Sequence, residues 1–316
     1  MTTAEPPSTI VARVLLLKRF PMFADVSPAA LTPLAERVAE TTAAAGEAVV
    51  REDGEAGTVH FVLEGRLEAR RLGFSAGTVG ASEVFGDVDA LAAAPVSLTT
   101  ARAAEPTRTL SVSRAGLLAA QEDCFPMQRA LLARVAAVGL DVQRRVGWKA
   151  VYARCEGAVE SLSVPDTPDL AHRVASMRTS REFARLRIRS LGRLAAAARI
   201  DSHTRESLLW RTGDPADFAV QVLRGRLRCT VPDGEEFEIA AATLLGLCEA
   251  LAGQPRWCDV VAASDVVTMR LDVEDILDEL EDDADVSAEL LSSLALDVAA
   301  LEDRIVRSGA DEREAE

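Results

Sequence analysis

Two stretches of this chain share one pattern, and that pattern decides the fold. Residues 212–228 read Thr212-Gly-Asp-Pro-Ala-Asp-Phe-Ala-Val-Gln-Val-Leu-Arg-Gly-Arg-Leu-Arg228, and residues 52–68 read Glu52-Asp-Gly-Glu-Ala-Gly-Thr-Val-His-Phe-Val-Leu-Glu-Gly-Arg-Leu-Glu68. In each, an apolar-rich strand reaches a Leu-x-Gly-Arg-Leu step, where the glycine allows a turn into a second strand. The chain is therefore predicted to be a tandem repeat of one β-rich domain.

Length and composition agree with two domains and argue against several partners. The 316 residues are 48% apolar but only 4% aromatic, which predicts two aliphatic cores. A net charge of −15 argues against nucleic acid and against an anionic membrane surface. We find no signal peptide, no apolar run of membrane-spanning length, and five scattered cysteines. A reducing cytoplasm is the expected location.

The predicted elements repeat in one order: helix, β-barrel, long C-terminal helix. Helices are expected at 9–20, from the N-cap Ser27 with Pro28 to about Thr42, from Ser113, at 127–149, at 170–199 and at 287–307. Strands are expected at 48–51, 59–63, 66–70, 99–103, 109–112, 207–210, 218–223, 227–231, 237–240, 260–263 and 266–271. The fold class is mainly β with helices (α+β).

This order predicts four segments along the chain. The first domain is placed at 9–150, a helical, Pro-containing linker at 151–180, the second domain at 181–308 and a charged tail at 309–316.

Two helices carry apolar seams. The first seam is Leu131, Val135, Val138 and Val142, and the second, at heptad spacing, is Leu291, Leu294, Val298, Leu301 and Ile305. The second seam predicts a homodimer or, paired with the first, an internal pseudo-dimer. The first seam fits packing on its own barrel equally well.

Charges are segregated between the basic helix 170–199 and the acidic run 272–285. We expect the two to pair within the chain. The alternatives are a basic site for an external acidic partner and two solvated faces that never meet.

The repeated segments resemble the cyclic-nucleotide-binding domain family. In the first half the similar segments are Leu17–Leu31, Ala45–Gly54 and Phe85–Val96, and in the second they are Thr212–Arg228 and Leu245–Arg256. The resemblance implies two β-roll or jelly-roll barrels, each with N-terminal helices and a long C-terminal helix. It also implies a phosphate-binding cassette, in which an Arg meets the phosphate and a Glu nine residues earlier accepts the ribose 2′-hydroxyl.

The first cassette departs from that pattern at both key positions. After Phe85 and Gly86, Asp87 stands at the Glu position, while Val96 replaces the Arg and Ser97 offers only an uncharged hydroxyl. Loss of the phosphate cation costs on the order of 2–5 kcal/mol, so this pocket is predicted to hold no cyclic nucleotide. Alternatively, Asp87 and Asp89 are N-cap or first-turn acids that stabilise a helix start without any ligand.

The second cassette has the Arg of the family pattern but not the Glu. Arg256 stands in the expected place, whereas Leu247 occupies the Glu position and Glu249 is displaced by two. The candidate ligand-binding residues here are Gly246, Leu247, Cys248, Glu249, Arg256 and Trp257. Alternatively, Arg256 is a loop residue on the surface.

No catalytic constellation is present in the sequence. The three histidines form no metal-binding pattern, and no nucleophile or P-loop motif occurs. The chain after the second barrel is too short for a DNA-binding module, and residues 1–20 lack the pseudosubstrate of kinase regulatory subunits.

These observations predict a bacterial-type, non-catalytic regulatory or scaffolding protein that acts through protein–protein contacts, with a cyclic nucleotide as candidate ligand of the second domain only. The alternative is a true sensor of cAMP, cGMP or a cyclic dinucleotide. A third hypothesis is a barrel that senses another small anion or an apolar ligand.

Overall fold

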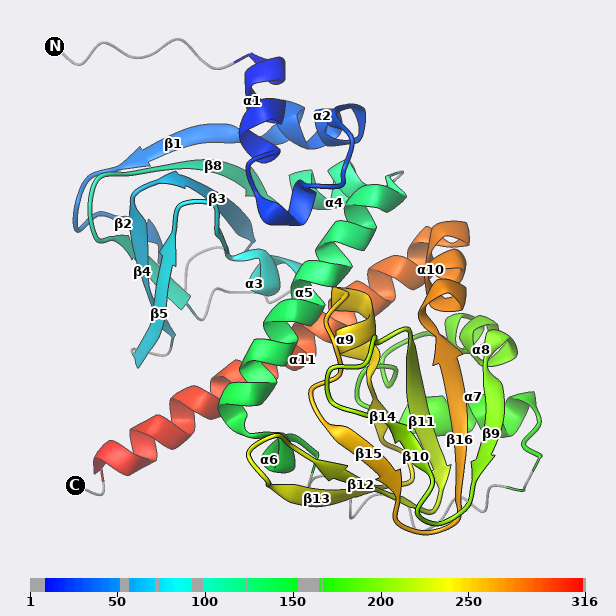
Figure 1. Ribbon diagram of the computed structural model, residues 1–316. Helices are drawn as coiled ribbons and strands as arrows, with labels where there is room; N and C mark the ends of the chain where they lie inside the picture. The colour runs from blue at the N-terminus through cyan, green and yellow to red at the C-terminus, as the bar shows by residue number, and fades with distance from the viewer. Residues whose placement is uncertain are drawn as a thin grey trace, which may run out of the picture. The chain divides into compact units, whose positions relative to one another are not determined.

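Each half of the chain is built from two four-stranded antiparallel sheets (Figure 1). The computed structural model describes residues 9–51, 57–71, 74–92, 99–122, 124–152, 165 and 167–314. Strand order is β1-β8-β3-β6 and β2-β7-β4-β5 in the first half, and β9-β16-β11-β14 and β10-β15-β12-β13 in the second. The two orders correspond strand for strand, which confirms both the tandem repeat and the mainly β class with helices.

The first half contains these elements along the chain. Its helices are α1 (Ile10–Leu17), η1 (Pro21–Phe23), α2 (Pro28–Arg37), α3 (Asp87–Leu91), α4 (Arg114–Gln121), α5 (Phe125–Val146) and α6 (Trp148–Tyr152). Its strands are β1 (Ala39–Ala43), β2 (Ala48–Val50), β3 (Thr58–Glu64), β4 (Arg66–Arg71), β5 (Phe74–Gly80), β6 (Val84–Phe85), β7 (Thr99–Ala103) and β8 (Thr107–Ser113).

The second half repeats them. Its helices are α7 (Leu170–Thr179), α8 (Ile188–Ala197), α9 (Leu247–Ala252), α10 (Val273–Asp282) and α11 (Ala284–Glu314). Its strands are β9 (Arg199–His203), β10 (Leu208–Trp210), β11 (Phe218–Arg224), β12 (Arg226–Thr230), β13 (Glu236–Ala240), β14 (Leu244–Leu245), β15 (Asp259–Ala262) and β16 (Val266–Asp272).

The Leu-x-Gly-Arg-Leu step is the corner where the chain leaves one sheet for the other. Gly65 joins β3 to β4, Gly225 joins β11 to β12, and both have left-handed backbones with φ of 83° and 84°. A side chain at Gly65 would lie 2.6 Å from the carbonyl oxygen of Pro106, and one at Gly225 would collide with that of Asp265. Only glycine fits such a corner, which explains its place in both repeats.

The residues fall into two compact units: Met1–Leu131 with Val298–Glu316, and Leu132–Asp297. In unit 1 a small-residue core lies inside the roll, formed by Val62, Leu67, Ala69, Phe85, Ala101 and Ala103. Outside it, Phe20 and Phe23 contact Phe61 with ring centroids 5.2 and 5.7 Å apart. The boundaries 9–150 and 181–308 remain predictions, with 151–180 as linker and 309–316 as tail.

The helix predicted from Ser27 to Thr42 is shorter than expected. Ser27 caps α2 and Pro28 occupies its first turn, as predicted, but the helix ends at Arg37. Thr41 and Thr42 instead belong to β1, where the Thr41 hydroxyl lies 2.8 Å from that of Thr109. The β-branched threonines favour this pairing with β8 over a further helical turn.

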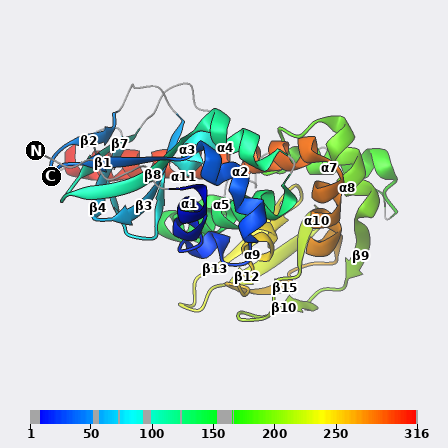
Figure 2. The same cartoon turned by 90° about the horizontal axis from the view of Figure 1, so that it is seen from above.

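The single basic helix predicted at 170–199 is wrong, because two helices occupy this range (Figure 2). Ser180 ends α7, with its hydroxyl donating to the Met177 carbonyl at 2.8 Å. The turn that follows buries Phe183 and Leu186 completely before α8 begins. The second roll then starts with β9 at Arg199, earlier than the predicted Ser207.

The last helix is also longer than predicted: α11 begins at Ala284 and continues to Glu314. Its seam residues Leu291, Leu294, Val298 and Leu301 are buried within the single chain, and Ile305 is half-buried. Leu131, Val135 and Val142 of α5 are buried too. The seam therefore has little free apolar surface for a second copy.

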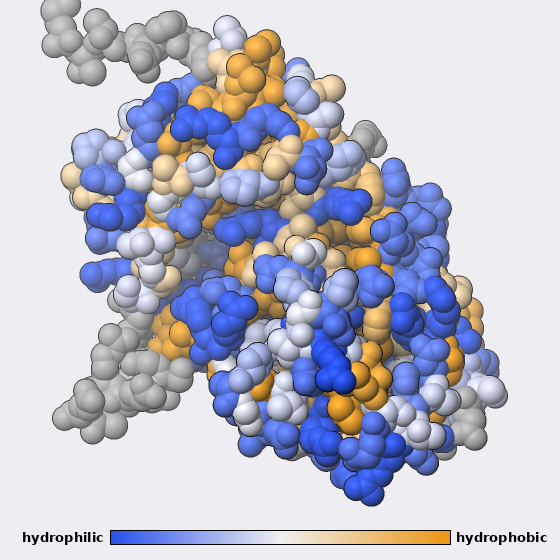
Figure 3. Space-filling model, viewed as in Figure 1, coloured by the Kyte–Doolittle hydropathy of each residue, from blue (hydrophilic) through white to orange (hydrophobic). Residues whose placement is uncertain are grey.

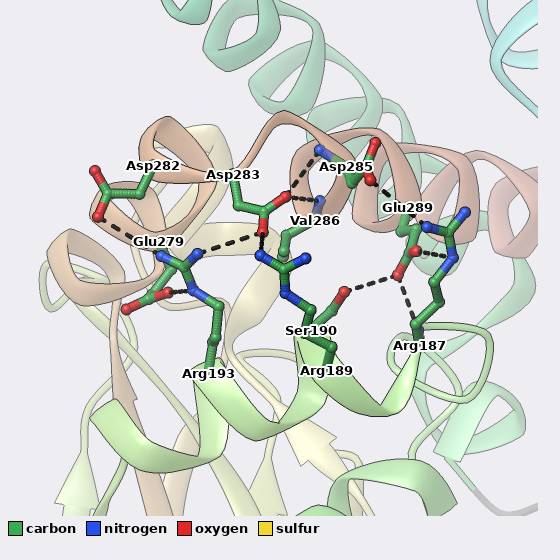
Figure 4. A network of polar contacts seen from close by, with 10 residues as sticks. All are labelled: Arg187, Arg189, Ser190, Arg193, Glu279, Asp282, Asp283, Asp285, Val286 and Glu289. Carbon is green, nitrogen blue, oxygen red and sulfur yellow. Dashed lines mark hydrogen bonds and ion pairs between the residues drawn. The ribbon is translucent and has the colours of Figure 1, made fainter.

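The basic and acidic segments do pair, within unit 2 (Figure 4). Arg193 of α8 contacts Glu279, Asp282 and Asp283, with the last two at 3.6 and 3.3 Å. Arg187 binds Glu289 at 2.8 Å. The predicted internal pairing is confirmed, and it joins α8 to α10 and to the start of α11.

The break between α10 and α11 lies at the centre of this network. Asp283 has an extended backbone (φ −142°, ψ 97°). Its Oδ1 accepts the backbone N–H groups of Asp285 and Val286 at 3.2 and 3.4 Å, which caps α11. Its Oδ2 meets Arg189 at 3.4 Å and Arg193 at 3.3 Å. One carboxylate thus starts a helix and anchors it to α8.

We expect Arg193→Ala to lower the thermal unfolding midpoint in low salt more than Arg189→Ala does. Among the described residues, Arg193 contacts three carboxylates from a 29% exposed position, whereas the 80% exposed Arg189 contacts one. In about 1 M NaCl the difference should largely vanish, because screening weakens exposed ion pairs. Thermal denaturation followed by circular dichroism at both salt concentrations measures it. Equal losses for the two variants would contradict this expectation.

Candidate functional site

The first cassette region is a tight turn followed by a one-turn helix. Phe85 lies on β6, Gly86 adopts a left-handed backbone with φ of 82°, and Asp87 begins α3 and is buried. A side chain at Gly86 would approach the Thr58 carbonyl oxygen to 2.6 Å. Val96 and Ser97 lie outside the described residues.

A buried arginine that the sequence analysis missed dominates this region. The Arg71 side chain, at the end of β4, is 3% exposed, and its guanidinium donates to Asp89 at 3.0 Å and to Asp303 at 2.7 Å. Glu302 lies 3.6 Å away and the Thr99 hydroxyl accepts at 3.2 Å. Three carboxylates therefore surround one cation and more than balance its charge.

The strand pattern contained a signal for Arg71. Side chains alternate along β4, so Arg71 shares the inward face of Leu67 and Ala69, and all three are buried. A charged side chain at an inward-facing position of a strand is buried and needs oppositely charged or hydrogen-bonding partners. That argument predicts a buried ion pair, although it does not predict that Asp303 supplies part of it.

Unit 1 also contains a cavity of about 340 Å³ against the cassette turn. Its lining includes Val50, His60, Phe85, Gly86 and Asp89. Burial lowers the pKa of His60 to about 4, so the imidazole is neutral near pH 7. One ring nitrogen, Nδ1, lies 3.2 Å from the Thr109 hydroxyl, and Nε2 has no partner.

The second cassette has the same turn but different chemistry. Gly246 has φ of 90°, and Leu247, which starts α9, is buried where the resemblance implies a glutamate. Two residues later, Glu249 is buried as well. Burial raises the pKa of the Glu249 carboxyl, and the charge of Arg256 opposes that rise only in part. Cys248 meets the Gln143 amide at 3.9 Å.

Arg256 is not a surface residue: it is 1% exposed. Its guanidinium lies over the rings of Trp210 and Phe218, 4.1 and 4.6 Å from their centroids. It donates to the carbonyl oxygens of Phe218 at 2.5 Å and Gly246 at 3.4 Å, while its Nε has no partner.

The charge of Arg256 is thus only weakly compensated. Among the described residues no carboxylate contacts it, and burial lowers the pKa of the guanidinium, with Glu249 opposing from a distance. The structure therefore brings Glu249 and Arg256 into one electrostatic neighbourhood. Trp257, the next residue, stacks on Trp148 of α6.

Another group of charged residues in unit 2 surrounds the buried Asp297. Asp297 of α11 meets Arg181 at 3.2 Å and Arg185 at 3.7 Å, and Arg181 also binds Glu182 at 2.8 Å. Burial, together with the nearby charge of Glu182, raises the pKa of Asp297 to about 7.

The two halves form a tandem of β-rolls, each with a left-handed glycine turn followed by a short helix. The family model described as cyclic nucleotide-binding domain matches residues 40–123 and 201–283, more than half of the chain. The chain belongs to this family. A comparison with curated proteins found no match. Among the described residues, no helix has the length and apolar character needed to span a membrane.

Several solved structures are similar over most of their length. The regulatory domain of Toxoplasma gondii PKA with cAMP is 14% identical, covers 94% of this chain and 95% of its own, and has a TM-score of 0.32. A regulatory subunit of a cAMP-independent protein kinase A from Trypanosoma cruzi, bound to guanosine, is 14% identical, with coverages of 88% and 90% and a TM-score of 0.32. The sensor domain of the transcriptional regulator DNR from Pseudomonas aeruginosa is 21% identical, with coverages of 48% and 95% and a TM-score of 0.38.

We expect Gly246→Ala to destabilise the protein by about 2–4 kcal/mol, since it forces a left-handed backbone and a collision with the Arg256 guanidinium. Gly253→Ala is the matched control, because Gly253 is also left-handed but has open space around it. It should cost about 1 kcal/mol. Urea denaturation measures both. In an Arg256→Ala background the Gly246→Ala cost should shrink, and an unchanged cost would show that Arg256 does not lie there.

We expect the free energy of unfolding of the wild type to decrease as the pH rises from about 4 to about 7. The titration of Asp297 alone should lower it by on the order of 1 kcal/mol per pH unit. The folded-state pKa, about 7, lies above the unfolded value. The stabilisation from Asp297 is therefore complete below about pH 4 and lost as the pH rises through 7. Asp297→Asn should flatten this slope, and Asp141→Asn, at an exposed position, should not. Urea denaturation across this pH range measures the slopes.

Proposed function

We propose that this protein is a non-catalytic regulatory protein that acts through contacts with other proteins, and that only its second domain responds to a nucleotide. One observation carries the proposal. The buried guanidinium of Arg256 contacts no carboxylate among the described residues, whereas Arg71 in the first unit is surrounded by three.

That contrast matters because an uncompensated buried cation is costly, and a bound anion relieves the cost. The cyclic phosphate of a nucleotide is such an anion, and the family to which the chain belongs supports this class of ligand. In the first unit the cation is already neutralised, so an added phosphate would meet Asp89 and Asp303 instead. This supports a single responsive site.

An exposed apolar surface supports the protein–protein part of the proposal. Ile10, Val11 and Leu15 on α1 are 44%, 70% and 64% exposed. Figure 3 shows the resulting apolar patch at the top of the view, where α1 lies. Exposed apolar patches of this kind mark contact surfaces for other proteins.

The second candidate function is a protein whose main role is sensing cAMP, cGMP or a cyclic dinucleotide. The electrostatic effect of Glu249 and Arg256 on each other favours it, because a carboxylate and a guanidinium are the two groups that a ribose phosphate requires. The two functions differ in how strongly a nucleotide stabilises the protein.

We expect cyclic nucleotide to raise the unfolding midpoint of the wild type and of Arg270→Ala, but not of Arg256→Met. Met keeps much of the length of Arg256 without its charge, and Arg270 packs on the same Phe218 ring at 3.7 Å. At about a hundred times its dissociation constant, a ligand stabilises by about 2.7 kcal/mol. Thermal shift with millimolar cAMP, cGMP and cyclic dinucleotides measures it. If none of them shifts the midpoint, the proposed nucleotide response is wrong and only the proposed role in protein–protein contacts stands.

A further inference from the structure

Three aromatic side chains of unit 2 gather on Trp257, the residue after Arg256. Trp148 lies face to face with it, with ring centroids 3.8 Å apart and an interplanar angle of 5°. Tyr152 and Phe237 lie 6.1 and 6.3 Å from Trp257, at 19° and 11°. The chain has three Trp and one Tyr, so this cluster takes its only Tyr and two of its Trp.

The Trp148–Trp257 pair has an unusual geometry for a protein core. Aromatic side chains prefer offset or edge-on contacts with centroids about 4.5–7 Å apart. A close parallel stack is instead how aromatic side chains hold the flat face of a nucleic acid base. Trp148 therefore occupies one face of Trp257 in the way that a stacked base ring would.

The helix that carries Trp148 is short and follows a glycine turn. Helix α6 has five residues, and Gly147, with φ of 90°, separates it from α5. Trp148, Val151 and Tyr152 are buried while Lys149 and Ala150 are exposed. Because so short a helix has almost no stability of its own, its side-chain contacts hold it in place.

The charge of Arg256, next to Trp257 in the chain, indicates which class of ligand fits the covered ring. Trp257 is joined directly to Arg256, whose guanidinium contacts no carboxylate among the described residues. A ring surface beside an uncompensated cation suits a flat ring that carries an anionic group. A purine nucleotide has both features.

We propose that Trp148 is an internal occupant of a binding site for a purine base on Trp257, and that α6 must leave before a base binds. The inference rests on the proposed nucleotide response of the second domain. It adds that the apparent affinity of the wild type is reduced by the fraction of molecules in which α6 covers the site.

The test is a titration with 2-aminopurine riboside, whose fluorescence falls on stacking. Trp148→Ala should bind it at least about tenfold more tightly than the wild type or Trp148→Phe, which keeps an aromatic ring on Trp257. The double variant Trp148→Ala/Trp257→Ala should lose the gain. Circular dichroism should show a split band from the stacked indoles in the wild type, absent in Trp148→Ala and in Trp257→Ala. The same spectra verify that each variant is folded.

The inference is overturned if folded Trp148→Ala binds no more tightly than the wild type, or if the double variant keeps the gain. Failure of the proposed function looks different. In that case cyclic nucleotides shift the unfolding midpoint of neither the wild type nor Trp148→Ala, while Trp148→Ala still gains affinity for the riboside, which supports the covered site.

Discussion

The placement of two buried arginines governs what each half of this molecule can do. Removing a guanidinium from water is costly, and each unit compensates the cost differently. Arg71 is compensated by ionic contacts with Asp89, Glu302 and Asp303. Arg256 relies on two aromatic rings and two carbonyl oxygens. Two copies of one fold therefore present opposite electrostatic conditions to an anion.

The repeats show how one backbone accepts this divergence. The corner glycines and the cassette glycines keep left-handed backbones in both units, with φ between 82° and 90°. The residue two positions into each short helix is acidic in both, Asp89 in one and Glu249 in the other. In the first unit this acid meets a strand arginine, and in the second it lies near an arginine of the cassette loop. The two halves therefore share the backbone conformation, whereas the arginine near the acid comes from a strand in the first half and from the cassette loop in the second.

Much of the fold followed from the sequence, because glycine corners and apolar strands are local signals. The Leu-x-Gly-Arg-Leu step, the Ser27 cap and the charge pairing of 170–199 with 272–285 were all predictable. The break at Ser180 was not, since it depends on burying Phe183 and Leu186 against the rest of the unit. Strand β1 was missed because its threonines form a strand only when β8 lies beside them.

The candidate site was less predictable for a related reason. Both cassettes were located, but the orientation of Arg256 depends on Trp210 and Phe218, which lie far from it in sequence. The aromatic cover from Trp148 is likewise a contact between distant residues. The composition indicated only that Trp and Tyr are scarce. No local sequence pattern predicts that two of them stack.

The first unit is assembled from two segments that lie far apart in the sequence, and this has a consequence for biosynthesis. Arg71 and Asp303 are 232 residues apart, and Val298–Glu316 belongs with Met1–Leu131. A nascent chain emerging from the ribosome completes the second unit before the first. Until the last helix is released, Arg71 lacks two of its three carboxylates. A premature stop near the C-terminus would therefore injure the part of the molecule that is made first.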